Sequence, residues 1–335
     1  MALDKRIQKL FETSMRRGLV IGKFLPIHNG HISLITFAAS QCDELIVSMS
    51  YTPGDKISPD LRFRWIKEIF KDQPKIKPSL IVDDFDIETL ALEERTLIWA
   101  KKMQAVYPKI DVLFSSEDYG EPFAINLEVE HILFDLPRKC TPISATLIRS
   151  NPFKYWDFIP KEVRPYFVKK ICFYGPESTG KSTLSEKMAL HYQTEFVPEV
   201  ARELITSNDI YVHDIIRIGI AQTERVKEKT KTANKVLFCD TDIITTKIYS
   251  KHYLNEIPEI LNELENEITY NLYFLLDIDV EWVADHLRDF GDKRLEMFNL
   301  FKGELEKRGI AYIIIRGNYQ ERENKVRSVI DSMLQ

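Results

Sequence analysis

The octapeptide GPESTGKS, residues 175–182, has residue types and a spacing suited to binding nucleotide phosphates. It matches GxxxxGK[ST], follows an apolar stretch and precedes a helical pattern. Glycines let successive backbone N–H groups face phosphate oxygens, a lysine supplies positive charge to the β- and γ-phosphates, and a serine hydroxyl can bind Mg²⁺. We therefore predict a P-loop kinase site that comprises Gly175, Glu177, Ser178, Thr179, Gly180, Lys181, Ser182 and Thr183.

Carboxylates further along the chain could complete this site. Asp240 and Asp242 follow the apolar stretch VLFC, where a carboxylate can hold Mg²⁺ or orient an attacking hydroxyl. Glu199 and Arg202 follow another short apolar stretch, although a Glu–Arg pair three residues apart is also common on surface helices. We predict Asp240 or Glu199 as the base, Ser182 and Asp240 as Mg²⁺ ligands, partly through water, and Arg202 and Asp242 as substrate-binding residues.

The segment DHLRDFGDKR, residues 285–294, suits a lid in which Arg288 and Arg294 supply positive charge to the transferred phosphoryl group, but it equally suits a solvated helix. A GTPase would be expected to carry NKxD as its base-reading motif. The corresponding stretch ANKVLF places Leu237 at the aspartate position. A kinase that acts on a small molecule is therefore favoured over a GTP switch.

A second candidate site lies near the start of the chain, in GKFLPIHNGHI, residues 22–32. His28 and His31 stand where a predicted strand gives way to a predicted helix, which is the ligand edge of an open parallel sheet. Two imidazoles there can donate hydrogen bonds to a triphosphate and to charge that builds on the α-phosphorus during displacement. A metal site is less favoured because no third ligand is near, and a plain surface turn remains the alternative.

The segment TPISATLIRSNPF, residues 141–153, contains a second probable helix start. Ser144, Thr146 and Arg149 place hydroxyl groups and a guanidinium there, which is a further means of binding phosphate. A simply capped helix explains this segment equally well when it is taken alone. The combination of the two segments is much more specific than either one.

The elements that must position these residues alternate between strand and helix. Apolar stretches read as strands in 17–24, 43–50 and 109–115, with helical patterns in 32–40 and 58–72, and the alternation restarts at residue 168. Two α/β domains with parallel sheets are predicted. Their boundaries are 1–150 and 168–335, and residues 151–167, rich in proline and aromatic residues, form a packed, stiff connector.

Charge and composition exclude several classes of protein. Residues 1–150 carry 20 basic and 21 acidic side chains and residues 151–335 carry 26 and 30, so neither half resembles a nucleic-acid-binding arm. About 17 residues precede the first strand, too few for a helix-turn-helix domain. The four cysteines form no CxxC pair, and no apolar run could span a bilayer. We expect a cytoplasmic protein that binds neither membrane nor nucleic acid.

HxGH after the first strand, with ISxTxxR near the end of that domain, resembles the nucleotidylyltransferase superfamily. Together with LRFRWIKEIFK, LFSSE, GPESTGKS, CDTDIITT and EWVADHLR, the chain resembles the bifunctional nicotinamide-mononucleotide adenylyltransferase/ribosylnicotinamide kinase family, NadR type, over nearly its whole length from about residue 17. The resemblance implies a Rossmann-like nucleotidylyltransferase domain followed by a P-loop kinase domain. We expect no counterpart of the N-terminal DNA-binding domain that regulatory members carry, so the resemblance does not imply repression.

The resemblance also implies an activity and ligands. ATP would adenylylate nicotinamide mononucleotide to NAD in the first domain, and ATP with Mg²⁺ would phosphorylate nicotinamide riboside in the second. Lys23, Phe24, His28, His31, Ser144, Thr146 and Arg149 would bind ATP or its phosphates, and Trp65 and Trp282 are further substrate-binding candidates. Pro198 stands where the family would have a tryptophan, so a partner that stacks on the nicotinamide ring is missing or supplied elsewhere, for example by Trp282.

Two rival functions stay open on the sequence. A phosphopantetheine adenylyltransferase joined to a dephospho-coenzyme A kinase has the same architecture, but threonine would be expected in place of His28. A regulator that senses NAD and ATP without turnover would retain the same binding residues. The sequence leaves open the oligomeric state, a homo-oligomer included, and the choice between amidated and deamidated mononucleotide.

Overall fold

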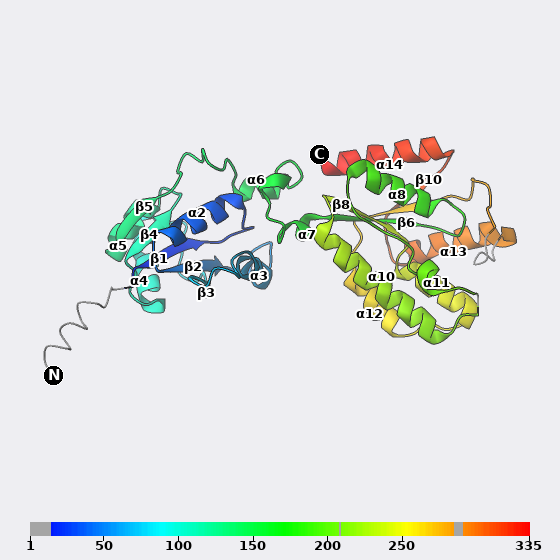
Figure 1. Ribbon diagram of the computed structural model, residues 1–335, viewed down its shortest axis with the longest axis horizontal. Coiled ribbons are helices and arrows are strands. Elements are labelled where there is room, and N and C mark those ends of the chain that lie inside the picture. The colour runs from blue at the N-terminus through cyan, green and yellow to red at the C-terminus, as the bar shows by residue number, and fades with distance from the viewer. Residues whose placement is uncertain (1–14, 208, 285–290) are drawn as a thin grey trace. The chain divides into compact units, whose positions relative to one another are not determined.

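The computed structural model describes residues 15–207, 209–284 and 291–335, and it divides into two compact units between Val163 and Arg164. Each unit is built on a five-stranded sheet whose strands are all parallel (Figure 1). The prediction of two α/β domains is confirmed. Within the described ranges, no helix has both the length and the apolar character to cross a bilayer.

The first sheet has the strand order β3-β2-β1-β4-β5, so the chain crosses back at β1 before it adds β4. In open parallel sheets, ligands bind outside the carboxyl ends of the strands at such a crossing. Central strand β1 is fully buried at Leu19 and Val20, as expected for a strand covered on both faces. The strands are β1 Arg17–Gly22, β2 Glu44–Tyr51, β3 Ile76–Val82, β4 Val112–Ser115 and β5 Glu130–Leu133.

Helices cover this sheet. The helices are α2 Asn29–Ser40, α3 Pro59–Ile69, α4 Leu92–Val106, α5 Gly120–Leu127 and α6 Ala145–Ser150. A side chain caps two of those described, His28 for α2 and Ser144 for α6. A buried cluster joins apolar side chains of α4 and α5 to those of the strands, Met103 and Phe123 among them. Pro59 opens α3, a position where the missing backbone N–H costs nothing.

The proline- and aromatic-rich stretch after α6 packs within the first unit as far as Val163. Phe153, Trp156 and Ile159 are buried, and the Asn29 side chain donates a hydrogen bond of 3.0 Å to a backbone carbonyl of this stretch. It contains a short 3₁₀ helix, Trp156–Phe158. Residues 164–167 form α7, Arg164–Phe167, which belongs to the second unit.

The second sheet has the order β10-β9-β6-β8-β7, with the first strand of the unit, β6, at its centre. The strands are β6 Lys169–Tyr174, β7 Phe196–Val197, β8 Val236–Asp240, β9 Leu272–Leu276 and β10 Tyr312–Ile315. The helices are α8 Lys181–Tyr192, α9 Ala201–Leu204, α10 Val212–Thr232, α11 Ile243–Leu254, α12 Ile260–Glu267, α13 Arg294–Lys307 and α14 Tyr319–Leu334, with a 3₁₀ turn at Gly291–Lys293.

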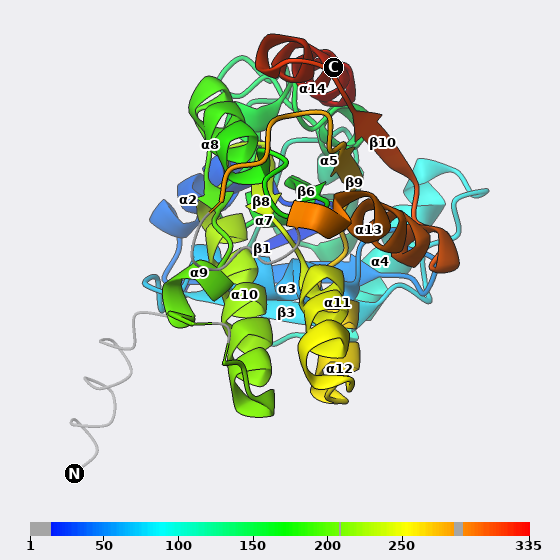
Figure 2. The ribbon, with the colours of Figure 1, turned by 90° about the vertical axis from the view of Figure 1, so that its right-hand side faces the viewer.

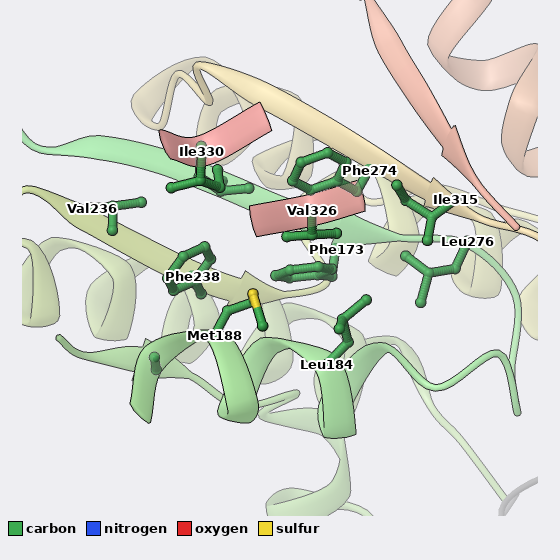
Figure 3. Close-up of a cluster of buried hydrophobic side chains, with 12 residues drawn as sticks. Phe173, Leu184, Met188, Val236, Phe238, Phe274, Leu276, Ile315, Val326 and Ile330 are labelled. Atoms are coloured by element: carbon green, nitrogen blue, oxygen red, sulfur yellow. The ribbon is translucent and has the colours of Figure 1, made fainter. Parts of the chain in front are cut away.

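Helices α8 and α14 cover one face of this sheet. Their side chains Leu184, Met188 and Val326 pack on the phenylalanines of the central strands, of which Phe173 and Phe274 are fully buried (Figure 3). Helices α11 and α13 contribute to a second buried cluster with strands β6 and β9. Helices α10, α11 and α12 lie side by side (Figure 2). The sheet is therefore buried on both faces, and its polar residues lie at the strand ends.

Candidate active sites

The two histidines of the first unit stand at the start of helix α2, as predicted. His28 is the N-cap, and its Nδ1 accepts hydrogen bonds from the backbone N–H of Gly30 at 3.1 Å and of His31 at 3.4 Å. The two imidazole rings stack with centroids 3.7 Å apart, at an interplanar angle of 22°. The ring of Phe24 meets the edge of the His31 ring, with centroids 5.0 Å apart. One helix N-terminus thus holds both imidazoles in a fixed arrangement.

Both imidazoles are neutral at physiological pH. Burial and the positive charge of Arg138 lower the pKa of His28 to about 3. Burial, together with His28 and Arg138, holds the pKa of His31 well below its usual range. Because Nδ1 of His28 accepts two N–H groups, the ring carries its proton on Nε2. Nδ1 of His31 is buried and has no hydrogen-bond partner within the described residues, which is typical of an atom that meets a ligand.

A cavity of about 290 Å³ lies beside this pair, at the carboxyl ends of β1 and β4. Its walls combine apolar side chains with hydroxyls and a few charged groups. The lining residues are Ile21, Gly22, Phe24, His28, Gly30, His31, Leu34, Ser116, Glu117, Tyr119, Phe134, Asp135, Arg138, Thr141, Ile143, Ser144, Ala145 and Thr146. Of the predicted residues, the cavity brings together Phe24, His28, His31, Ser144 and Thr146.

The predicted helix start at residue 144 is confirmed. Ser144 caps α6, and its hydroxyl accepts a hydrogen bond of 3.3 Å from the N–H of Leu147. Arg149 is exposed, and its guanidinium donates to the carbonyl of Leu25 and, at 3.1 Å, to the hydroxyl of Thr146. Arg149 therefore connects the loop before the histidines to the start of α6.

Two other predicted residues lie apart from the cavity walls. Trp65 is 5% exposed and packs inside the unit on helix α3. The ammonium group of Lys23 lies 3.6 Å from a carboxylate oxygen of Asp83. Neither side chain belongs to the cavity lining described above.

The P-loop of the second unit joins β6 to α8. Gly175 has φ +136°, and a Cβ there would lie 2.9 Å from the carbonyl oxygen of Leu276, so a glycine is required. Gly180 precedes α8 with φ +85°, another conformation that favours glycine. The Lys181 ammonium donates a hydrogen bond of 2.9 Å to the carbonyl of Pro176 and is largely buried. The loop thus surrounds a lysine at a helix N-terminus, an arrangement that binds phosphate.

Asp240 ends strand β8 beside this loop and is 1% exposed. Burial and the negative charge of Glu199 raise its pKa to about 6, although Lys181 and a hydrogen bond from Ser182 act in the opposite direction. Its Oδ1 is buried and has no hydrogen-bond partner within the ranges that the structure describes. Glu199 itself pairs with Arg202 at 3.0 Å. The Asp240 carboxyl is therefore within the electrostatic influence of both Glu199 and Lys181.

A cavity of about 200 Å³ opens between the P-loop and helices α9, α10 and α11. Polar P-loop residues form one side, and isoleucines and two tyrosines form the other. The lining residues are Glu177, Ser178, Thr179, Gly180, Lys181, Ser182, Thr183, Glu199, Ala201, Arg202, Ile205, Ile210, Ile215, Ile218, Gln222, Thr241, Thr245, Thr246, Tyr249 and Tyr253. The predicted P-loop residues from Glu177 to Thr183, together with Glu199 and Arg202, meet here.

Asp242 has a local structural role. It caps α11 by accepting hydrogen bonds from the N–H of Thr245 at 2.9 Å and from the hydroxyl of Tyr273 at 2.9 Å. Burial raises its pKa to about 6. It is absent from the lining of the 200 Å³ cavity.

The predicted lid is described in part. Arg288 lies outside the described residues. The guanidinium of Arg294 lies 5.7 Å from the ring centroid of Trp282 and donates a hydrogen bond of 3.4 Å to the carbonyl of Ser178. Trp282 is not among the residues that line the 200 Å³ cavity. The aromatic side chains in its lining are Tyr249 and Tyr253.

Comparisons with known proteins agree with the division of the chain into two units. A cytidylyltransferase-like family model matches residues 19–151, and an AAA domain model matches residues 170–322. The trifunctional NAD biosynthesis/regulator protein NadR of Escherichia coli (strain K12) is 33% identical over 325 residues, which cover 88% of this chain and 78% of that protein. The chain belongs to the NadR family.

Two further relatives of this NadR-family chain are informative. A nicotinamide-nucleotide adenylyltransferase of Thermococcus onnurineus (strain NA1) is 27% identical over 165 residues, which cover 47% of the chain and 83% of that enzyme. A crystal structure of NadR protein in complex with NR has the same fold, with a TM-score of 0.79 and 22% identity, and the match covers 95% of this chain and 96% of that one. The resemblance identified from the sequence motifs is confirmed.

Sequence reasoning missed several lining residues of both cavities in this NadR-family chain. Glu117 follows β4 within LFSSE, a motif that carried the resemblance, so the end of that strand could have indicated it. Arg138 lies in an irregular loop that no periodicity marks. Tyr249 and Tyr253 are four residues apart on α11, and this spacing reads equally well as a buried helix face.

Proposed function

We propose that the protein makes NAD in two steps, phosphorylating nicotinamide riboside at the P-loop site and adenylylating nicotinamide mononucleotide at the histidine site. The observation that carries the proposal is the pair of separate cavities, one in each unit and each beside a predicted phosphate-binding motif, in a chain of the NadR family. ATP is a substrate of both steps. The family membership favours this reading over coenzyme A synthesis, in agreement with the imidazole at His28.

In adenylyl transfer, a phosphate oxygen of the mononucleotide bonds to the α-phosphorus of ATP, and the bond to the β-phosphate oxygen breaks to release pyrophosphate. The attacking phosphate is already an anion, so positioning and charge stabilisation dominate catalysis. The neutral imidazoles of His28 and His31 donate N–H groups to the α-phosphate as its charge grows. Ser144 and Thr146 bind further phosphate oxygens from the start of α6. Arg149 supports the loop that carries the histidines.

In the kinase step, the 5′-hydroxyl oxygen of the riboside bonds to the γ-phosphorus, the bond to the β–γ bridging oxygen breaks to give ADP, and the hydroxyl proton passes to a carboxylate. Lys181 neutralises charge on the β- and γ-phosphates. Glu199 lines the cavity, so we assign it as the base. Arg202 pairs with Glu199 and orients it.

The P-loop site suits Mg²⁺, because Ser182 offers a hydroxyl and the buried Oδ1 of Asp240 has no hydrogen-bond partner among the described residues. Oxygen ligands of this kind are the ones that Mg²⁺ prefers. When bound, the ion neutralises charge on the β- and γ-phosphates.

The apolar half of the kinase cavity suits the nicotinamide ring. Pro198 removes one aromatic partner, but Tyr249 and Tyr253 line the cavity and their rings stack with centroids 6.3 Å apart, at an angle of 19°. We propose that these tyrosines, rather than Trp282, contact the ring. The four cysteines are all free thiols, which is consistent with a cytoplasmic location.

One experiment separates this function from its rivals. The protein is supplied with Mg·ATP and nicotinamide riboside, nicotinamide mononucleotide or phosphopantetheine, and the products are identified by mass. NAD from both nicotinamide substrates is the expected result. Dephospho-coenzyme A would instead indicate the coenzyme A enzyme, and binding of ATP and NAD without any product would indicate a sensor.

A further inference from the structure

Arg138 and Glu117 form an ion pair at the wall of the 290 Å³ cavity. Their guanidinium nitrogen and carboxylate oxygen lie 2.6 Å apart, and the two side chains are 39% and 53% exposed. Both residues line the cavity, Glu117 from the loop after β4 and Arg138 from the loop before α6. A second guanidinium nitrogen donates to the carbonyl of Ile143 at 3.4 Å. Such an exposed pair contributes little to stability, so its position needs another reason.

The loop around Arg138 adopts a costly conformation. Asp135 and Arg138 both have left-handed φ angles, of 45° and 52°, which favour glycine. The Asp135 carboxylate accepts hydrogen bonds of 2.8 Å from the backbone N–H groups of Lys139 and Cys140. These bonds hold the turn in which Arg138 sits. A strained residue maintained by its surroundings is characteristic of binding sites.

The charge of Arg138 matters because the cavity has little other positive charge. His28 and His31 are neutral at physiological pH, and Arg138 is one cause of the lowered pKa of both. Among the residues that line the cavity, all within the described part of the chain, Arg138 carries the one permanent positive charge. A triphosphate in this cavity would therefore meet the Arg138 guanidinium in the cavity wall, and an arginine fork suits phosphate oxygens.

We propose that Arg138 binds the polyphosphate of ATP in the adenylyltransferase site, and that Glu117 occupies its guanidinium until ATP binds. This inference rests on the proposed adenylyl transfer. When ATP enters, phosphate oxygens replace the carboxylate as the acceptors of the guanidinium N–H groups. Glu117 is then a competitor for the same cation. The pair sets the affinity for ATP, and the two members act in opposite directions.

The test is the KM for ATP in adenylyl transfer from saturating nicotinamide mononucleotide. Arg138→Gln should raise this KM about ten- to hundredfold, because a charge-assisted hydrogen bond to phosphate is lost. Arg138→Lys should recover part of the loss by keeping the charge. Glu117→Gln should lower the KM about two- to fivefold, because the internal competitor is neutral. Kinase activity should stay unchanged in all three variants.

A closely matched pair serves as the control. Arg16 and Glu130 are also 2.6 Å apart in the first unit, with side chains 40% and 57% exposed, and neither lines the cavity. Arg16→Gln and Glu130→Gln should leave the KM for ATP unchanged. A general effect of surface charge or of ion-pair loss would instead appear in both pairs.

Three outcomes overturn the proposal. They are an unchanged KM in Arg138→Gln, a raised KM in Glu117→Gln, and a change in the KM for the mononucleotide alone. If the wild-type protein makes no NAD, the proposed function fails separately. Calorimetric ATP binding to Lys181→Ala protein, with and without Arg138→Gln, then decides the role of Arg138.

Discussion

Two imidazole rings stacked 3.7 Å apart would repel each other if both were protonated, so their neutrality and their stacking belong together. Burial keeps the pKa of His28 at about 3, and that of His31 also well below its usual range. The site therefore offers N–H donors whose strength does not change near neutral pH. Charge stabilisation at the α-phosphate then depends on geometry, which the N-cap bonds of His28 provide.

His31→Ala should lower adenylyl transfer by about 10²–10³, because one donor to the charge that develops at the α-phosphate is lost. The buried Nδ1 of His31, which has no partner in the described residues, supports this role. Rates of NAD formation from nicotinamide mononucleotide measure the effect, and riboside phosphorylation by the same protein is the control. Near-normal adenylyl transfer by this variant would contradict the role.

Asp242 should make the stability of the second unit depend on pH. Its pKa of about 6 lies above the usual value for an aspartate, so the folded state holds the proton more tightly than the unfolded state. Asp242 therefore lowers the free energy of unfolding by about 3 kcal/mol as pH rises from about 4 to 7, and its contribution changes no further above that range. Asp242→Asn should remove this fall, because the amide does not titrate.

Urea unfolding read by hydrogen exchange in β6 and β8, repeated at several pH values, measures this difference. Asp240, whose pKa is also about 6, remains in the variant and contributes equally to both curves. Parallel curves for the two proteins would show that folding does not raise the pKa of Asp242.

For individual residues, the sequence was informative where a motif requires one particular backbone geometry. GPESTGKS and HNGH each predict a helix N-terminus at a strand end, and the structure has both. It was less informative for single side chains. Asp242 follows Asp240 by two residues, yet the first caps a helix and the second faces the P-loop. Both aspartates follow the same apolar stretch, so the sequence pattern could not distinguish their roles.

At the scale of secondary-structure elements, Arg322 of helix α14 supports the P-loop. It is 1% exposed, and its guanidinium donates to the carbonyls of Thr179 at 2.7 Å, of Asp277 at 3.0 Å and of Gly317 at 2.8 Å. It also pairs with the carboxylate of Asp279. One side chain thus ties the last helix to the P-loop and to the ends of β9 and β10.

Arg322→Leu should destabilise the second unit by about 2–4 kcal/mol, because three backbone carbonyls lose their donor and the exposed Asp279 carboxylate loses its partner. Kinase activity should be lost, while adenylyl transfer is retained. The matched control on the same helix is Arg327→Leu, since Arg327 is 39% exposed and lies 3.8 Å from Glu323. Calorimetric unfolding together with both activities measures these effects, and equal stability of the two variants would show that Arg322 is dispensable.

The sequence pattern identified the central strands but missed some of the edge strands. β6 and β8 are buried on both faces and appear in the sequence as apolar runs. β3 and β5 are edge strands of the first sheet, and β3 contains an exposed lysine and a proline, which an edge tolerates. An edge strand is only partly buried, so its sequence lacks the apolar run that marks a central strand.

At the scale of the whole molecule, the charge balance predicts the absence of operator binding. Residues 1–150 and 151–335 are each slightly acidic, so neither gains affinity from release of counterions around DNA. Titration with labelled duplexes that contain candidate operators, at low and at physiological salt, should show no sequence-specific complex. A salt-sensitive nanomolar complex with one duplex would overturn this prediction.

The two units should act as separate enzymes joined in one chain. Lys181 belongs to the P-loop of the second unit, and the histidine site lies wholly within the first. Mutations in sites with no shared partners have additive effects. Loss of the charge that Lys181 places on the β- and γ-phosphates should therefore lower kinase turnover by orders of magnitude and leave adenylyl transfer unaffected.

NAD synthesis by Lys181→Ala protein should then depend on the substrate supplied. With nicotinamide mononucleotide the variant should make NAD at close to the normal rate, and with nicotinamide riboside it should make almost none. A mixture with His31→Ala protein should restore NAD synthesis from the riboside, because the mononucleotide made by one protein diffuses to the other. Loss of both reactions in Lys181→Ala protein that is still folded by circular dichroism would mean that the two sites are coupled, because a change confined to the P-loop would then have reached the histidine site.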